Sequence, residues 1–99
     1  MNVDNEVYET KAYAKKSLEI CLERDSHDFS LIGNKISRTS ESAARLRRKI
    51  SYCKNSIKLA NFKHALKIRE RRLILLDKDF TNLRVKIRDI NRALKTAMD

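Results

Sequence analysis

The sequence has no proline, no tryptophan and a single glycine, Gly33. Tight turns depend mostly on glycine and proline, and a β-sheet needs several of them. A chain of 99 residues with almost none of these residues therefore favours a few long helices joined by very few turns. The high share of Lys, Arg, Leu, Ile and Ala favours helices as well. The composition predicts an all-α fold in a single helical domain, residues 1–99.

The sequence also lacks the residue patterns that carry catalysis or bind cofactors. Its two histidines and two cysteines show no HxxxH, ExxH or CxxC spacing, whereas a metal site needs three or four converging ligands. One glycine is too few for a phosphate-binding loop. Ser26, His27 and Asp28 have the letters of a hydrolytic triad, but working triads draw their residues from distant segments. These absences predict a protein that is not an enzyme and has no cofactor, metal or small-molecule substrate.

Targeting and membrane segments are not evident in the sequence either. The first nine residues have no basic stretch followed by an apolar one, as a signal peptide would. The longest aliphatic run, residues 73–76, is far too short to span a membrane. The sequence predicts a cytoplasmic protein, and export by a leaderless secretion route is compatible with the same features.

The clearest positive signal is a heptad pattern that begins at Phe29. Steps of three and four residues alternate through ten positions, and a pattern of this kind lays one apolar seam along a helix. Nine of the ten positions are apolar and one holds threonine: Phe29, Ile32, Ile36, Thr39, Ala43, Leu46, Ile50, Cys53, Ile57 and Ala60.

A second heptad register fits the C-terminal part of the chain. Nine of its ten positions are apolar as well, and Arg69 is the exception. One heptad position is occupied by Leu66, Leu73, Phe80, Ile87 and Leu94, and the other by Arg69, Leu76, Leu83, Ile90 and Ala97.

The two registers do not join, because the second begins six residues after Ala60 instead of three or four. A continuous helix would turn its apolar stripe away from the seam at that point. Asn61 suits a helix end and a helix cap. The offset therefore predicts an antiparallel coiled-coil hairpin with helices over about 29–60 and 62–97. One bent helix of nearly 70 residues is the other interpretation.

A shorter N-terminal helix is predicted over about residues 3–25. Its apolar face is weaker, and the polar stretch of residues 25–28 favours a break before the next helix. Docked on the hairpin, this helix would complete a three-helix bundle; undocked, it would leave an oligomeric coiled coil. The sequence leaves open which of the two forms.

Charge is distributed unevenly. The net charge of the chain is +10, but residues 1–34 carry four basic and seven acidic residues, whereas residues 35–72 carry thirteen basic and two acidic residues. A strongly basic segment favours binding to a polyanion. The residues predicted to bind one are Arg45, Arg47, Arg48, Lys49, Arg71 and Arg72.

The run Leu73–Ile74–Leu75–Leu76 bears on function, because four consecutive apolar residues cover more than one side of a helix. A two-helix hairpin covers only one side, so another helix is expected on the second. We therefore predict a non-catalytic adaptor, chaperone or assembly subunit that pairs with protein partners in a homo- or hetero-oligomer. A basic helical bundle that binds nucleic acid is the second hypothesis. The residues predicted to form the packing and partner interface are Ile36, Leu46, Ile50, Ile57, Leu73, Leu76, Phe80, Leu83, Ile87 and Ile90.

Overall fold

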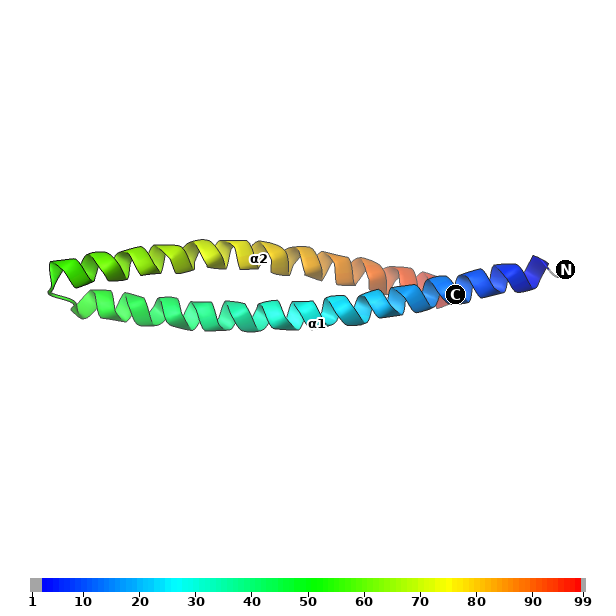
Figure 1. Cartoon of the computed structure of the whole chain (residues 1–99). Helices are drawn as coiled ribbons and strands as arrows, with labels where there is room; N and C mark the ends of the chain where they lie inside the picture. The colour runs from blue at the N-terminus through cyan, green and yellow to red at the C-terminus, as the bar shows by residue number, and fades with distance from the viewer. Residues whose placement is uncertain (1–2, 99) are drawn as a thin grey trace. The chain divides into compact units, whose positions relative to one another are not determined.

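The computed structural model describes residues 3–98, with side chains from residue 11 to residue 96, and contains two helices and no strand within that range. Helix α1 spans Val3–Tyr52 and helix α2 spans Ser56–Met98 (Figure 1). Residues 53–55 form the turn that joins them. The predicted all-α helical hairpin is confirmed, and the interpretation as one continuous bent helix is wrong.

The turn is organised by Asn55, which caps α2. Its side-chain Oδ1 accepts hydrogen bonds from the backbone N–H groups of Ile57 and Lys58, at 3.0 and 3.1 Å. Its backbone carbonyl accepts the first helical bond, from the N–H of Leu59 at 2.9 Å. These bonds satisfy donors that the first turn of a helix otherwise leaves unpaired. The chain therefore reverses without a glycine or proline, and no residue of the described backbone has a positive φ.

The predicted position of the turn, near Asn61, is wrong. Asn61 lies inside α2, and the chain reverses at residues 53–55. The first heptad register therefore stops at Cys53, and its last two positions, Ile57 and Ala60, are exposed. A polar residue that can cap occurs at both sites, and only the hydrogen bonds of Asn55 identify which one begins the helix.

The separate N-terminal helix predicted over residues 3–25 is also wrong, because α1 passes through residues 25–28 without a break. The heptad register of α1 continues backward from Phe29 to Asp25, Leu22 and Leu18, and all four side chains are half-buried or buried. Polar residues lower helix propensity only modestly, so packing along a continuous seam outweighs them. Residues 3–98 therefore form two helices, which does not support the predicted three-helix bundle.

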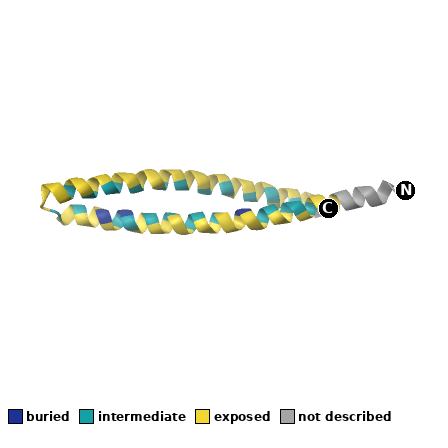
Figure 2. Ribbon diagram, viewed as in Figure 1, coloured by how far each residue is buried: buried dark blue, intermediate teal, exposed yellow. Residues whose placement is uncertain are grey.

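Two compact units divide the structure. We call Leu31–Thr81, which contains the turn, the turn unit, and residues 3–30 together with 82–98 the terminal unit. In the turn unit the buried and half-buried residues lie where α1 and α2 face each other (Figure 2). Ala43 and Leu46, exposed by 0% and 8%, are the most buried apolar residues described. The core of the turn unit is therefore one narrow seam, and the outer sides of its two helical segments are exposed.

Candidate interaction surface

Nine of the ten residues predicted to form the packing and partner interface lie on the seams. In the turn unit Leu46 is buried, and five others are half-buried, namely Ile36, Ile50, Leu73, Leu76 and Phe80. In the terminal unit Leu83, Ile87 and Ile90 are half-buried. Ile57 differs, because it follows the turn and is 74% exposed. Nine of these residues are therefore placed for packing within the chain, so a surface for a partner has to be sought elsewhere.

Arg69, the exception in the second register, is accommodated on the seam by hydrogen bonds. Its Nε donates to Oγ of Ser42 on α1, and its Nη1 donates to the backbone carbonyl of Ala65 at 3.1 Å. Each bond offsets part of the cost of removing a guanidinium from water. Arg69 therefore ties α2 to α1 at one point of the seam.

An exposed ion pair joins α1 and α2 in the turn unit. Nη2 of Arg47 lies 3.4 Å from Oε1 of Glu70, and both side chains are about half exposed. A pair this exposed stabilises a protein by well under about 1 kcal/mol. Its main effect is on charge, since it neutralises Arg47, one of the residues predicted to bind a polyanion.

Two adjoining cavities open elsewhere on the turn unit. The first is lined by Lys35, Arg38, Thr39, Arg72 and Leu76. The second shares three of these residues and adds three others, Ser42, Ile68 and Arg69. Because they share Arg38, Thr39 and Arg72, we treat them as one surface, the basic groove. None of its eight lining residues is acidic.

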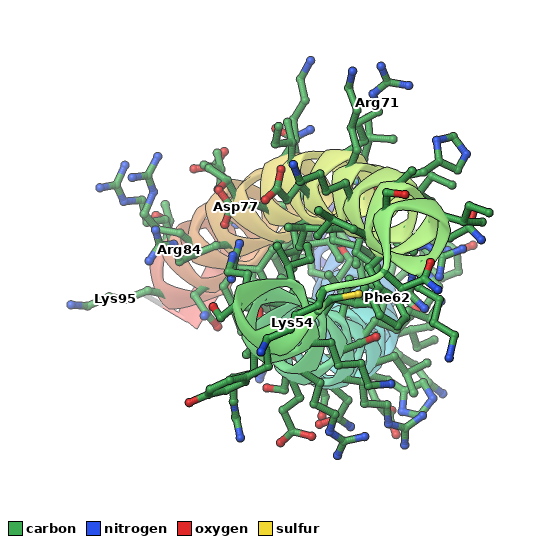
Figure 3. All side chains as sticks on the ribbon, turned by 90° about the vertical axis from the view of Figure 1, so that its left-hand side faces the viewer. Lys54, Phe62, Arg71, Asp77, Arg84 and Lys95 are labelled. Atoms are coloured by element: carbon green, nitrogen blue, oxygen red, sulfur yellow. The ribbon has the colours of Figure 1, made fainter. Side chains whose placement is uncertain are left out.

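The residues predicted to bind a polyanion do not gather in the basic groove. Among them only Arg72 lines it. Lys49 has its Nζ 5.7 Å from the ring centre of Phe62, near the turn. Figure 3 shows Arg71 pointing away from α1. The other three residues predicted to bind a polyanion, Arg45, Arg47 and Arg48, are exposed on α1.

Three basic residues of the groove were not predicted as site residues: Lys35, Arg38 and Arg69. A signal for two of them exists in the sequence. Lys35 precedes the seam residue Ile36, where side chains flank the contact between helices, and Arg69 is the only charged residue in the second register. Arg38 carries no such signal, because its approach to Arg72 depends on how the two helices align.

Large apolar side chains are exposed on α2 near the basic groove. Ile68 and Leu75 are 48% and 64% exposed, and Ile74 is 69% exposed. Residues seven positions apart share one stripe of a helix, so Leu75 extends along α2 the stripe that begins at the groove residue Ile68. The surface around the basic groove is therefore basic and apolar together.

The terminal unit has a different surface. One cavity is lined by apolar residues and by four charged ones, Arg24, Asp25, Lys86 and Asp89. Another lies along α2 and is mainly basic, with Arg84, Arg88, Arg92 and Lys95 among its lining residues. Oδ1 of Asp89 lies 3.7 Å from Nε of Arg88. The lining of the first cavity therefore holds charges of both signs, whereas the second cavity, like the basic groove, has no acidic residue in its lining.

No family model, curated protein or solved structure matches the chain. Within the described residues, no three His, Cys, Asp or Glu side chains are grouped so that they could hold a metal ion. A search of the same residues for a helix with enough apolar length to cross a membrane finds none. The site is thus defined by its own geometry, as a basic groove bordered by exposed apolar residues.

Proposed function

We propose that this chain is a non-catalytic interaction module, a helical hairpin that pairs with helices of partner proteins. It would act as an adaptor, a chaperone or a structural subunit of an assembly. The observation that carries the proposal is the split in the run of residues 73–76. Leu73 and Leu76 are half-buried on the seam, whereas Ile74 and Leu75 are 69% and 64% exposed.

The energetic reason for a partner follows from this split. Fully burying a Leu or Ile side chain stabilises a protein by about 1.5–3 kcal/mol. Two such residues next to each other on an otherwise solvated helix favour a packing partner, because large exposed apolar patches commonly mark interaction sites. Since Ile74 and Leu75 stay exposed in the single chain, a helix of another chain is the most direct cover for them.

The non-catalytic part of the proposal is supported by the positions of Ser26, His27 and Asp28. They occupy consecutive positions of α1 and all three are exposed. Successive side chains of a helix point about 100° apart, so these three groups diverge and do not form a line of nucleophile, base and orienting carboxylate.

Photo-crosslinking tests the proposal. A photoreactive phenylalanine analogue is placed at Leu75 in the full chain, and the matched control carries it at Arg48, an exposed position of α1 that does not line the groove. In the native host we expect a protein adduct from position 75, mapped by mass spectrometry to a helical segment of one partner, and much less from position 48. Equal yields from both positions, or no protein adduct from position 75, would contradict the proposal.

A nucleic-acid-binding bundle is the second candidate, and the basic groove is the observation that favours it. Lys35, Arg38 and Arg72 line that groove with no acidic residue among them. Binding through phosphate contacts would fall steeply with salt and would not depend on base sequence. Protein purified at low salt would then absorb strongly at 260 nm, and nuclease treatment would remove that absorbance. A clean preparation at low salt would rule this candidate out.

A further inference from the structure

The chemistry of the partner can be deduced from what surrounds the basic groove. We propose that the groove and the exposed stripe beside it dock an amphipathic helix of a different protein, whose apolar stripe is flanked by Asp and Glu. This inference rests on the proposed pairing function and adds the class of partner.

Both helices that border the groove carry apolar and basic residues beside it. On α2, Arg72 lies between the exposed Ile68 and Leu75. On α1, Leu31 is 45% exposed and lies seven residues before the groove residue Arg38, with Arg45 seven residues beyond it. Positions seven apart share a stripe, so the groove side of α2 is mainly apolar, with Ile68 and Leu75, and that of α1 is mainly basic, with Arg38 and Arg45.

The length of this surface suits a helix. From Leu31 to Arg45 the stripe of α1 extends roughly 21 Å, at about 1.5 Å per residue. A partner helix of about four turns covers that distance. A third helix that lies against an antiparallel pair contacts both, with apolar anchors inward and charged side chains at the flanks.

The positive charge of the groove determines which residues should flank the apolar stripe of the partner helix. Lys35, Arg38 and Arg72 line the groove, and no acidic residue lines it. Glu70, one of the few acidic residues of the turn unit, is already held by Arg47 at 3.4 Å. Carboxylates on the partner would meet these three cations, and such complementarity gives specificity and raises the rate of association.

A second copy of the chain fits this surface poorly. Residues 35–72 carry thirteen basic and two acidic residues, so pairing this segment with the same segment of a second copy brings like charges together. The phosphates of a nucleic acid would pair with the cations but would leave Ile68 and Leu75 exposed to water. In addition, no aromatic residue lines the groove for bases to stack on. An acidic amphipathic helix satisfies the basic and the apolar residues together.

The test uses the full chain and synthetic helical peptides of three heptads, labelled for fluorescence anisotropy. The first peptide has leucine along one stripe and glutamate at the flanks. The second has lysine in place of glutamate, and the third keeps glutamate but has serine in place of leucine. We expect saturable binding of the first peptide, at least about ten-fold tighter than that of either other peptide.

Variants with matched controls locate the binding. The double change Arg38→Glu with Arg72→Glu removes two cations of the groove, and Arg48→Glu with Arg71→Glu makes the same charge change outside it. We expect a loss of about ten-fold or more for the first pair and under about three-fold for the second. Likewise Leu75→Ser is expected to weaken binding more than Ile74→Ser. Helix content measured by circular dichroism verifies that each variant is folded.

Three results would overturn the inference: equal binding of the glutamate and lysine peptides, equal effects of the two charge-reversal pairs, or tighter binding of single-stranded poly(U) or anionic phosphatidylserine vesicles than of the glutamate peptide. The proposed function is tested separately. A specific protein adduct from position 75 without binding of the glutamate peptide would leave pairing intact and refute only the acidic partner.

Discussion

The turn unit and the terminal unit share the same heptad spacing, but they accommodate a charged residue on the seam in different ways. In the turn unit the half-buried Arg69 donates one hydrogen bond across to Ser42 and another to the backbone of its own helix. In the terminal unit Asp25 is 3% exposed, and its ion pair, at 3.7 Å, is with the adjacent Arg24 on the same helix.

This difference bears on stability. Removing a charge from water costs several kcal/mol, and close hydrogen bonds are what offset that cost. Arg69 has two such bonds and stays partly exposed, whereas Asp25 is almost fully buried with a long ion pair. The turn unit also holds the two most buried apolar residues described, Ala43 and Leu46. We therefore expect the turn unit to be the more stable of the two.

The largest expected effect tests where the core lies. Leu46→Ala is expected to lower the free energy of unfolding by about 2–4 kcal/mol, because it removes a buried side chain from the seam. Leu22→Ala, at a half-buried position of the terminal unit, is expected to cost about 1 kcal/mol. Urea unfolding followed by circular dichroism measures both changes. A larger loss of unfolding free energy for Leu22→Ala than for Leu46→Ala would mean that the terminal unit is the more stable of the two.

An intermediate effect concerns the two charged residues on the seams. Asp25→Leu is expected to raise the free energy of unfolding by about 1–3 kcal/mol, since an apolar residue on the seam replaces a nearly buried carboxylate whose ion pair, at 3.7 Å, is with the exposed Arg24. Arg69→Leu is expected to change it by less than about 1 kcal/mol, because the gain is offset by leaving Ser42 without its partner. Thermal unfolding compares the two variants. A destabilised Asp25→Leu protein would mean that Asp25 has stronger contacts than this ion pair.

The smallest expected effect lies at the turn itself. Asn55→Ala removes two capping hydrogen bonds and is expected to cost about 1 kcal/mol. The control is Asn61→Ala, at the site where the sequence alone had placed the turn. Because Asn61 is exposed inside α2, alanine there is expected to stabilise the helix by a few tenths of a kcal/mol. If urea unfolding showed that Asn61→Ala destabilises the protein and Asn55→Ala does not, the turn would have to be placed at residue 61.

The two heptad registers predicted most of the packing because seam positions recur whatever the partner helix is. Residues from Phe29 to Cys53 and from Leu66 to Leu94 are half-buried or buried at the predicted steps. The part of the first register before Phe29 was missed because Asp25 occupies one of its positions, and a polar residue there resembles the start of a helix break. Nothing in the periodicity distinguishes the cap at Asn55 from the one proposed at Asn61, because Ile57 and Ala60 also fit the heptad.

The basic groove was predictable only in part. Its charge was evident from the thirteen basic residues between positions 35 and 72, but the particular residues depend on the alignment of the helices. With a turn at Asn61, residue 47 would lie opposite residue 75, whereas in the structure Arg47 contacts Glu70. An error in the position of a turn shifts every cross-helix pair. The charged residues that meet across the seam therefore had to be read from the structure.

The most direct test of the central claim, that this hairpin lacks one helix and takes it from an acidic partner, is the mass in solution. Light scattering after size exclusion would be measured on nuclease-treated full chain, alone and with the glutamate-flanked peptide. We expect the mass of one chain alone and a complex of one chain with one peptide after addition. A stable homo-oligomer whose mass does not change when the peptide is added would contradict the claim.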